Sequence, residues 1–179
     1  MAPRKKQLLE AALAYALAHG IAKLSLRPLA AELGTSPRML MFYFKSKEGL
    51  LRELLAELHA RLLVSFRKMA SVEPRRPEPL LKRFWRWGSS EKNFPLLRLL
   101  YEAQVVAAQN PAEFGSYLKD ASAAWQAATL EFLSPSLRSE SMATLCVAVF
   151  DGLFLELMST GERDRLTRAL DRFIGLTAP

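Results

Sequence analysis

The chain has 179 residues, of which 50% are hydrophobic, and it carries 25 Lys and Arg against 18 Asp and Glu, a net charge of +7. This length allows one domain with a real core, or a small module joined to a larger one, and it excludes a short peptide module. A basic chain favours polyanionic partners, which are nucleic acid or anionic lipid, and charge alone does not choose between them. The excess is concentrated at one end, since residues 1–48 hold eight basic and three acidic side chains.

Cysteine usage and hydropathy indicate a soluble protein of a reducing compartment. Cys146 is the only cysteine and lies in an apolar run, so it is expected to be a buried thiol in the cytoplasm. Basic residues 4–6 precede the apolar run 11–18, which superficially resembles a secretory signal peptide. However, Glu10 interrupts the run, and its apolar residues recur at the spacing of an amphipathic core helix. No uninterrupted apolar run approaches the roughly 18 residues that span a bilayer, so no membrane partner is expected.

Hydrophobic periodicity predicts an all-α protein. Apolar residues recur at i, i+3, i+4 spacing from Leu8 to Phe173, and no stretch alternates between apolar and polar residues. With Pro, Gly and Ser as boundary signals, helices are predicted at residues 4–19, 26–33, 37–44, 47–70, 80–87, 94–109, 112–133, 140–159 and 163–176. The expected domains are a small N-terminal module, residues 1–48, joined by the long fourth helix to a helical domain, residues 49–179.

The segment from Ser25 to Lys47 has the layout of a helix-turn-helix. Two short helices flank a turn that begins with Gly34, and in such a unit the second helix lies in the major groove of DNA. Ser36 and Pro37 suit the N-cap and the first position of the second helix. Two short helices around a glycine turn also occur in proteins that bind no DNA, so the spacing alone leaves both readings open.

Side chains at the edges of this unit favour DNA. The two N-cap serines and the N–H groups that open each helix can meet a phosphate, and Lys45 and Lys47 follow directly. Arg27 and Arg38 lie near the helix starts, where a guanidinium can reach base edges. An Arg fork to guanine is the commonest specific contact between protein and DNA.

These residues carry a family resemblance. Residues 8–54, and especially LSLRPLAAELGTSPRMLMFYFKSKEGLL, resemble the DNA-binding domain of the tetracycline-repressor (TetR) family. The resemblance implies an all-α homodimeric repressor of palindromic operators, with a C-terminal domain that dimerises and binds a small molecule that releases the DNA. The C-terminal half of this family is divergent, so the resemblance gives little information about the ligand.

The resemblance also implies a DNA-contacting surface. Ser25 and Lys47 match phosphate-contacting positions, whereas Arg27, Pro37 and Arg38 match positions that face bases. The whole expected set comprises Ser25, Arg27, Ser36, Pro37, Arg38, Met39, Phe42, Tyr43, Lys45 and Lys47.

Two positions depart from the family pattern. Met39 stands where a small or hydroxylated residue is frequent, and Met41 stands where a phosphate-binding Tyr is usual. Neither side chain donates a hydrogen bond, so the phosphate contacts are expected to be fewer, or to come from Tyr43, Lys45 and the basic residues 4–6. We expect both methionines to pack rather than to contact thymine methyl groups.

The C-terminal half is expected to dimerise and to bind a ligand. Helix 140–159 is apolar almost all round, which indicates burial on more than one face, and with helix 163–176 it suits a four-helix dimer interface or, alternatively, a monomeric core. A pocket needs apolar walls and a few polar anchors. The expected ligand contacts are Trp87, Tyr101, Gln104, Trp125, Phe150 and Asp151. Most aromatic residues of this set are also expected in the core, and for Asp151 a hydrogen bond to a neighbouring helix end is the preferred alternative.

The rest of the sequence lacks motifs typical of catalytic, metal-binding or phosphate-binding sites. His19 and His59 stand alone, there is no paired His and Glu at helical spacing, and neither a phosphate-binding glycine loop nor a GxSxG elbow occurs. No enzyme activity, metal or cofactor is therefore expected. The alternative to a regulator is a helical sensor or adaptor whose helix-turn-helix no longer binds DNA.

Overall fold

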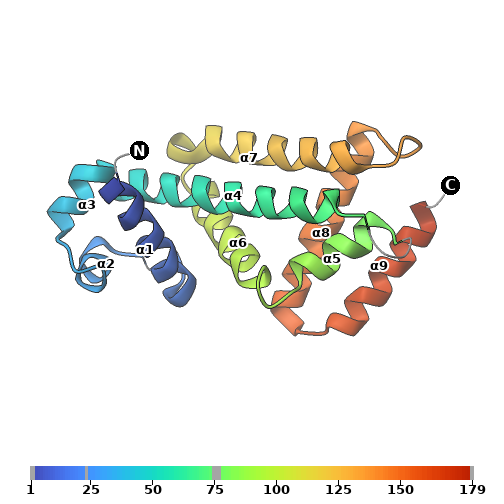
Figure 1. Cartoon of the computed structure of the whole chain (residues 1–179), viewed down its shortest axis with the longest axis horizontal. Coiled ribbons are helices and arrows are strands. Elements are labelled where there is room, and N and C mark those ends of the chain that lie inside the picture. The colour runs from blue at the N-terminus through green and yellow to red at the C-terminus, as the bar shows by residue number, and fades with distance from the viewer. Residues whose placement is uncertain (1–2, 23, 74–77, 178–179) are drawn as a thin grey trace. The chain divides into compact units, whose positions relative to one another are not determined.

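The computed structural model describes residues 3–22, 24–73 and 78–177, and this part of the chain contains helices and no strand, which confirms the expected all-α class. Figure 1 shows the arrangement of the helices. They are α1 (Pro3–His19), α2 (Leu26–Glu32), α3 (Pro37–Phe44), α4 (Lys47–Ser71), α5 (Leu80–Gly88), α6 (Phe94–Ala108), α7 (Pro111–Phe132), α8 (Glu140–Thr160) and α9 (Arg163–Thr177). The predicted helix ends agree with these bounds to within one residue.

Serine and glycine set the ends of the helices as the sequence predicts. The Ser36 and Ser139 side chains accept hydrogen bonds from the N–H groups three residues later, both at 3.2 Å, which caps α3 and α8. Pro37 occupies the first position of α3, where its missing N–H costs nothing. Gly161 ends α8 with a φ of 71°, a conformation that glycine adopts without a steric penalty.

Backbone contacts divide the chain into two compact units, residues 1–62 with 95–120 and residues 63–94 with 121–179. Helices α4 and α7 contribute residues to both units. The division by function, at residues 48 and 49, stays a prediction.

The first unit packs the apolar faces of α1, α2, α3 and the first part of α4 together. Leu29 of α2, Leu40 of α3 and Leu50 of α4 are completely buried. Leu26 and Leu33 are only half-buried. In Figure 1 the three N-terminal helices gather at the N-terminal end of α4, so the helix-turn-helix lies where that long helix begins.

The second unit has an aromatic core centred on Phe84. Its ring lies 4.5 Å from the Phe150 ring, edge-on, and stacks at 5.3 Å on Trp87. Trp87 donates its indole N–H to the Ser65 hydroxyl at 2.9 Å, which satisfies the polar atom of a buried ring. Cys146 is buried as predicted, and this burial raises the pKa of its thiol.

Helix α8 stands out by its hydropathy. By length and composition it could cross a membrane, although core helices of soluble proteins meet the same criteria. Only 28% of its most apolar stretch is buried within the chain. The exposed apolar residues of α8 include Leu145 and Leu155.

We expect Leu29→Ala to lower the free energy of unfolding by about 2–5 kcal/mol, because it leaves a cavity in a fully buried site. Met41→Ala is the control, since its side chain is exposed and its truncation should change stability by no more than about 0.5 kcal/mol. Denaturant unfolding followed by circular dichroism measures both values. Similar losses for the two variants would contradict the described packing.

Candidate nucleic-acid interface

The turn between α2 and α3 depends on a glycine. Gly34 has a φ of 58°, and its N–H donates to the Ala31 carbonyl at 3.2 Å while the Thr35 N–H donates to the Ala30 carbonyl at 2.9 Å. This pair of bonds is the Schellman motif that closes a helix and satisfies its last carbonyl groups. It reverses the chain within four residues, so that Ser36 is positioned to cap α3.

Helix α3 has a buried face and an exposed face. Leu40 and Phe44, one turn apart, are buried, whereas the exposed fractions are 39% for Met39, 42% for Met41 and 64% for Phe42. The expectation that both methionines pack is therefore wrong. With about 100° of rotation per residue, a helix that buries positions 40 and 44 turns positions 39, 41 and 42 outward.

Most of the residues expected to contact DNA, apart from those already described, lie at the surface. Arg27, Pro37 and Arg38 are exposed, as is Ser25, which is the N-cap of α2 and makes no side-chain capping bond. Tyr43 and Lys47 are half-buried, and the Ser36 oxygen is already engaged with the Met39 N–H.

Lys45 ends α3 in an unusual backbone conformation. Its φ is 69°, the only positive value among the non-glycine residues that the structure describes. Such a conformation costs of order 1–3 kcal/mol and is often found at functional sites. The Lys45 ammonium donates to the Phe42 carbonyl at 3.2 Å and lies 5.6 Å from the centre of the Phe42 ring. The charge therefore stays beside the exposed face of α3.

The basic arm at residues 4–6 is only partly available. Lys5 pairs with Glu53 of α4 at 2.6 Å and lies over the Phe44 ring, so it binds within its own unit. Arg4 and Lys6 are exposed. The arm can therefore offer two cations to a phosphate rather than three.

A carboxylate of α6 holds the loop that leads into α2. Glu102 accepts hydrogen bonds from the N–H groups of Ile21 and Ala22, both at 2.9 Å. Gly20 faces the same carboxylate, and a Cβ at this position would lie 2.9 Å from its oxygen. Sequence reasoning missed Glu102, although it is the only acid among residues 94–108. A lone carboxylate in an apolar helix was the available signal.

The six expected ligand contacts fall into separate environments. Trp87, Trp125 and Phe150 belong to the aromatic core, in which Phe66 lies 6.0 Å from Trp87 and 5.8 Å from Trp125 between ring centres. Asp151 is exposed on α8. Tyr101 and Gln104 are half-buried on α6, in the first unit.

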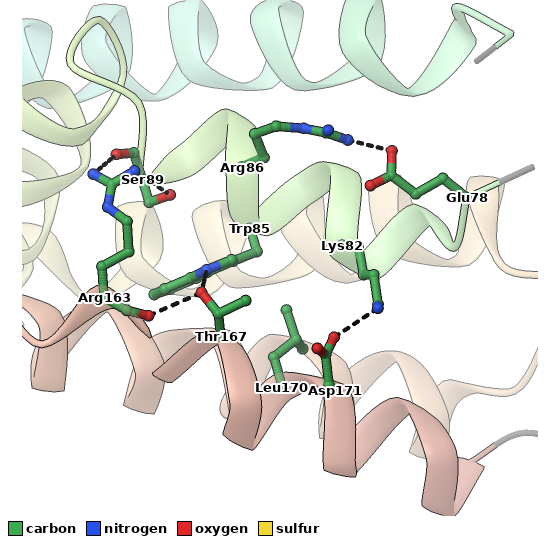
Figure 2. Close-up of a pocket in the computed structure, with 9 residues that line it drawn as sticks. All are labelled: Glu78, Lys82, Trp85, Arg86, Ser89, Arg163, Thr167, Leu170 and Asp171. Atoms are coloured by element: carbon green, nitrogen blue, oxygen red, sulfur yellow. Dashed lines mark hydrogen bonds and ion pairs between the residues drawn. The ribbon is translucent and has the colours of Figure 1, made fainter. Parts of the chain in front are cut away.

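A cavity of about 280 Å³ lies between α5 and α9, and Figure 2 shows its lining. Its wall contains a Lys82–Asp171 ion pair at 2.8 Å and a hydrogen bond from the Trp85 indole to the Thr167 hydroxyl at 2.8 Å. Arg163 reaches across it to Ser89, whose hydroxyl it contacts at 3.2 Å. None of the six expected ligand contacts lines this cavity.

Metal chemistry has no support in the described part of the chain. No group of three or more His, Cys, Asp or Glu residues there is arranged to hold a metal ion. Burial lowers the pKa of His59, whose ring lies edge-on to Tyr117 with 6.4 Å between ring centres. His59 therefore belongs to the packing of its unit.

The comparison with protein families agrees with the geometry of the N-terminal helices. Residues 8–54 match the family described as bacterial regulatory proteins, tetR family, which confirms the resemblance inferred from the sequence. A comparison with curated proteins gives no significant match.

Solved structures share the fold over nearly the whole chain. A transcriptional regulator from Rhodococcus sp. Rha1 is 20% identical with a TM-score of 0.76, and the match covers 96% of this chain and 94% of that one. A protein from Saccharomonospora viridis in complex with choline is 18% identical with a TM-score of 0.77, covering 99% and 98%. The multidrug binding protein EbrR complexed with imidazole is 23% identical with a TM-score of 0.67, covering 96% and 90%. At these identities the similarity establishes the fold.

We expect Glu102→Ala to lower the free energy of unfolding by about 1–3 kcal/mol, because two backbone N–H groups lose a charged acceptor. Hydrogen exchange at the amides of Ile21 and Ala22 should accelerate at the same time. Glu91→Ala, at an exposed position, is the control and should leave both quantities unchanged. Unaltered exchange at the two amides in Glu102→Ala would show that the carboxylate does not hold this loop.

Proposed function

Since residues 8–54 match the family described as bacterial regulatory proteins, tetR family, we propose that the chain is a cytoplasmic transcriptional repressor that binds a palindromic operator as a homodimer. A small molecule then releases the DNA. The observation that carries this proposal is the orientation of α3. Its Leu40 and Phe44 side chains are buried, and its remaining face is exposed to solvent. A helix with such a face fits the major groove.

The proposed contacts divide into phosphate and base contacts. Ser25, Ser36 and Lys47 meet phosphates at the edges of the unit, and Arg27 and Arg38 reach base edges. Pro37, Met39, Phe42, Tyr43 and Lys45 complete the proposed surface. The exposure of most of these residues supports their role.

Helix α8 supports a symmetric dimer. Leu145, Ala148, Gly152 and Leu155 are exposed at heptad spacing, which forms an apolar stripe that a partner helix can cover. A lipid environment suits this helix poorly, because the exposed Asp151 lies within the same stretch. A second copy of the chain, packed through α8 and α9, buries the stripe in a four-helix contact.

The proposed effector contacts form two separate candidate sites, one with Tyr101 and Gln104 in the first unit and one with Trp87, Trp125, Phe150 and Asp151 in the second. EbrR was solved with ethidium and the Saccharomonospora viridis protein with choline, and both ligands are organic cations. Aromatic rings bind such cations through their negative faces, as the cluster around Phe84 can if it opens. An organic cation is therefore the effector class that we propose to test first.

Helix α6 offers a route from the effector to DNA. Tyr101 and Gln104 flank Glu102, whose carboxylate holds the loop before α2. An effector that displaces α6 therefore moves the start of the helix-turn-helix. Because two recognition helices of a dimer must lie about 34 Å apart to enter successive major grooves, a small tilt spoils both contacts.

A second candidate function is a helical sensor or adaptor that does not bind DNA. It is favoured by Met41, which is exposed where the family usually has a phosphate-binding Tyr. The two candidates differ in their response to DNA and salt, which the next experiment measures.

Selection of bound sequences from random DNA should yield a palindrome, and affinity for it should fall steeply with salt as phosphate contacts release counterions. On this operator Arg38→Ala should cost about 1–3 kcal/mol and leave non-specific binding unchanged. Lys47→Ala should weaken binding to all sequences alike. Titrations of both variants on operator and unrelated DNA at several salt concentrations test this division.

Absence of selected sequences, or binding that is insensitive to salt, would favour the sensor or adaptor. Equal losses for Arg38→Ala and Lys47→Ala on every sequence would refute the assigned division between base and phosphate contacts.

We expect Leu155→Glu to convert the dimer into a monomer, because it places a charge in the apolar stripe of α8. Val105→Glu is the matched control, since Val105, at 59%, is at least as exposed as Leu155, at 51%, but lies on α6. Light scattering coupled to size-exclusion chromatography reports the mass of each variant. A dimer that survives Leu155→Glu, or a wild-type monomer, would contradict the proposed interface.

A further inference from the structure

The exposed face of α3 has an apolar centre. Leu40 and Phe44 define the buried side of this helix. Because successive residues are rotated by roughly 100° around the helix axis, Phe42 points about 180° away from their mean direction. Phe42 is accordingly the most exposed of the large apolar residues of α3, at 64%. A groove that receives this helix meets the Phe42 ring first.

Phe42 has two neighbours on this face with different chemistry. Arg38 precedes it by one turn, at i, i+4 spacing, and Met39 lies at i, i+3 spacing, so the three side chains form one continuous patch. All three are exposed. The patch therefore offers a hydrogen-bonding fork beside an apolar surface.

The Phe42 ring is held in place by side chains of its own helix end. The Tyr43 ring lies edge-on to it with 5.1 Å between ring centres, and the Lys45 ammonium lies 5.6 Å from its centre. Neither contact covers the ring, which stays exposed. The ring is therefore pre-organised and loses little conformational freedom when a partner binds it.

The surroundings of the patch are basic, which argues for a nucleic-acid partner. Residues 33–47 contain Arg38, Lys45 and Lys47 and no acidic side chain. This charge repels a second copy of the same face and is complementary to phosphate. In the major groove, the apolar group within reach of such a helix is the C5-methyl group of thymine.

We propose that Phe42 and Met39 read thymine methyl groups in the major groove, next to a guanine that Arg38 reads. This inference rests on the proposed function, and it names the chemistry by which this chain selects its operator. Each half-site then contains thymines at fixed positions beside the guanine, and its recognition depends on methyl groups as well as on hydrogen bonds. The exposed methionine and phenylalanine, which donate no hydrogen bond, thereby gain a role in specificity.

The test replaces each thymine of the selected operator by deoxyuridine, one position at a time, which removes the methyl group and keeps the base pair. We expect one or two positions in each half-site at which the wild-type protein binds about fourfold more weakly, the factor for losing one buried methyl-sized group. Replacements elsewhere in the site should leave the affinity unchanged. The unmodified protein is used throughout, so folding is not at issue.

Protein variants assign the methyl contacts to residues. Phe42→Ala should abolish the difference between thymine and deoxyuridine at one position, and Met39→Ala should do so at another or at the same one. Arg38→Ala should bind the operator more weakly but keep the full difference. Val105→Ala, at an exposed apolar position on α6, is the control and should behave as the wild type.

The outcomes separate this inference from the proposed function. Sequence-specific binding that is indifferent to deoxyuridine at every position overturns the methyl contacts and leaves the repressor intact. A methyl dependence that persists in both Phe42→Ala and Met39→Ala also overturns the assignment. Failure to bind any sequence specifically overturns the proposed function itself.

Discussion

Burial of Leu40 and Phe44 fixes the rotation of α3, and the candidate interface depends on this orientation. Two anchors one turn apart leave a helix of eight residues no freedom to roll, so the same packing that stabilises the unit selects which side chains meet a partner. The Schellman turn at Gly34 and the cap at Ser36 fix where the helix starts. Fold stability and recognition are thus set by the same few contacts.

Helix α6 connects to this arrangement through the Glu102 carboxylate. Glu102 binds backbone N–H groups rather than side chains, so its contact transmits a shift of α6 to the chain itself. The loop enters α2 directly, so this contact lies next to the start of the helix-turn-helix. The link joins α6 to a loop that precedes it by 81 residues in the sequence.

Local signals account for the success of the predicted helices. Ser36, Ser139, Gly34 and Gly161 act on their immediate neighbours, so their effect is visible in the sequence. The exposure of Met41 was also implicit there, since Leu40 and Phe44 are the i, i+4 pair that a helix buries together. Contacts between residues far apart in the sequence could not be predicted from such local signals.

The contact of Glu102 with Ile21 spans 81 residues, and the meeting of Trp125 with Phe66 depends on how α4 and α7 pack. No sequence period encodes such pairings. The ligand contacts expected from the sequence consequently mix core aromatics with surface groups.

The proposed methyl contact of Phe42 has a consequence beyond the choice of operator. A side chain that recognises a methyl group on C5 of a pyrimidine responds to the same group when it is carried by a modified cytosine. Enzymatic methylation of cytosine at the corresponding position would present the ring with the contact that thymine offers. Occupancy of a site could then follow the epigenetic state of the DNA without any change in its base sequence.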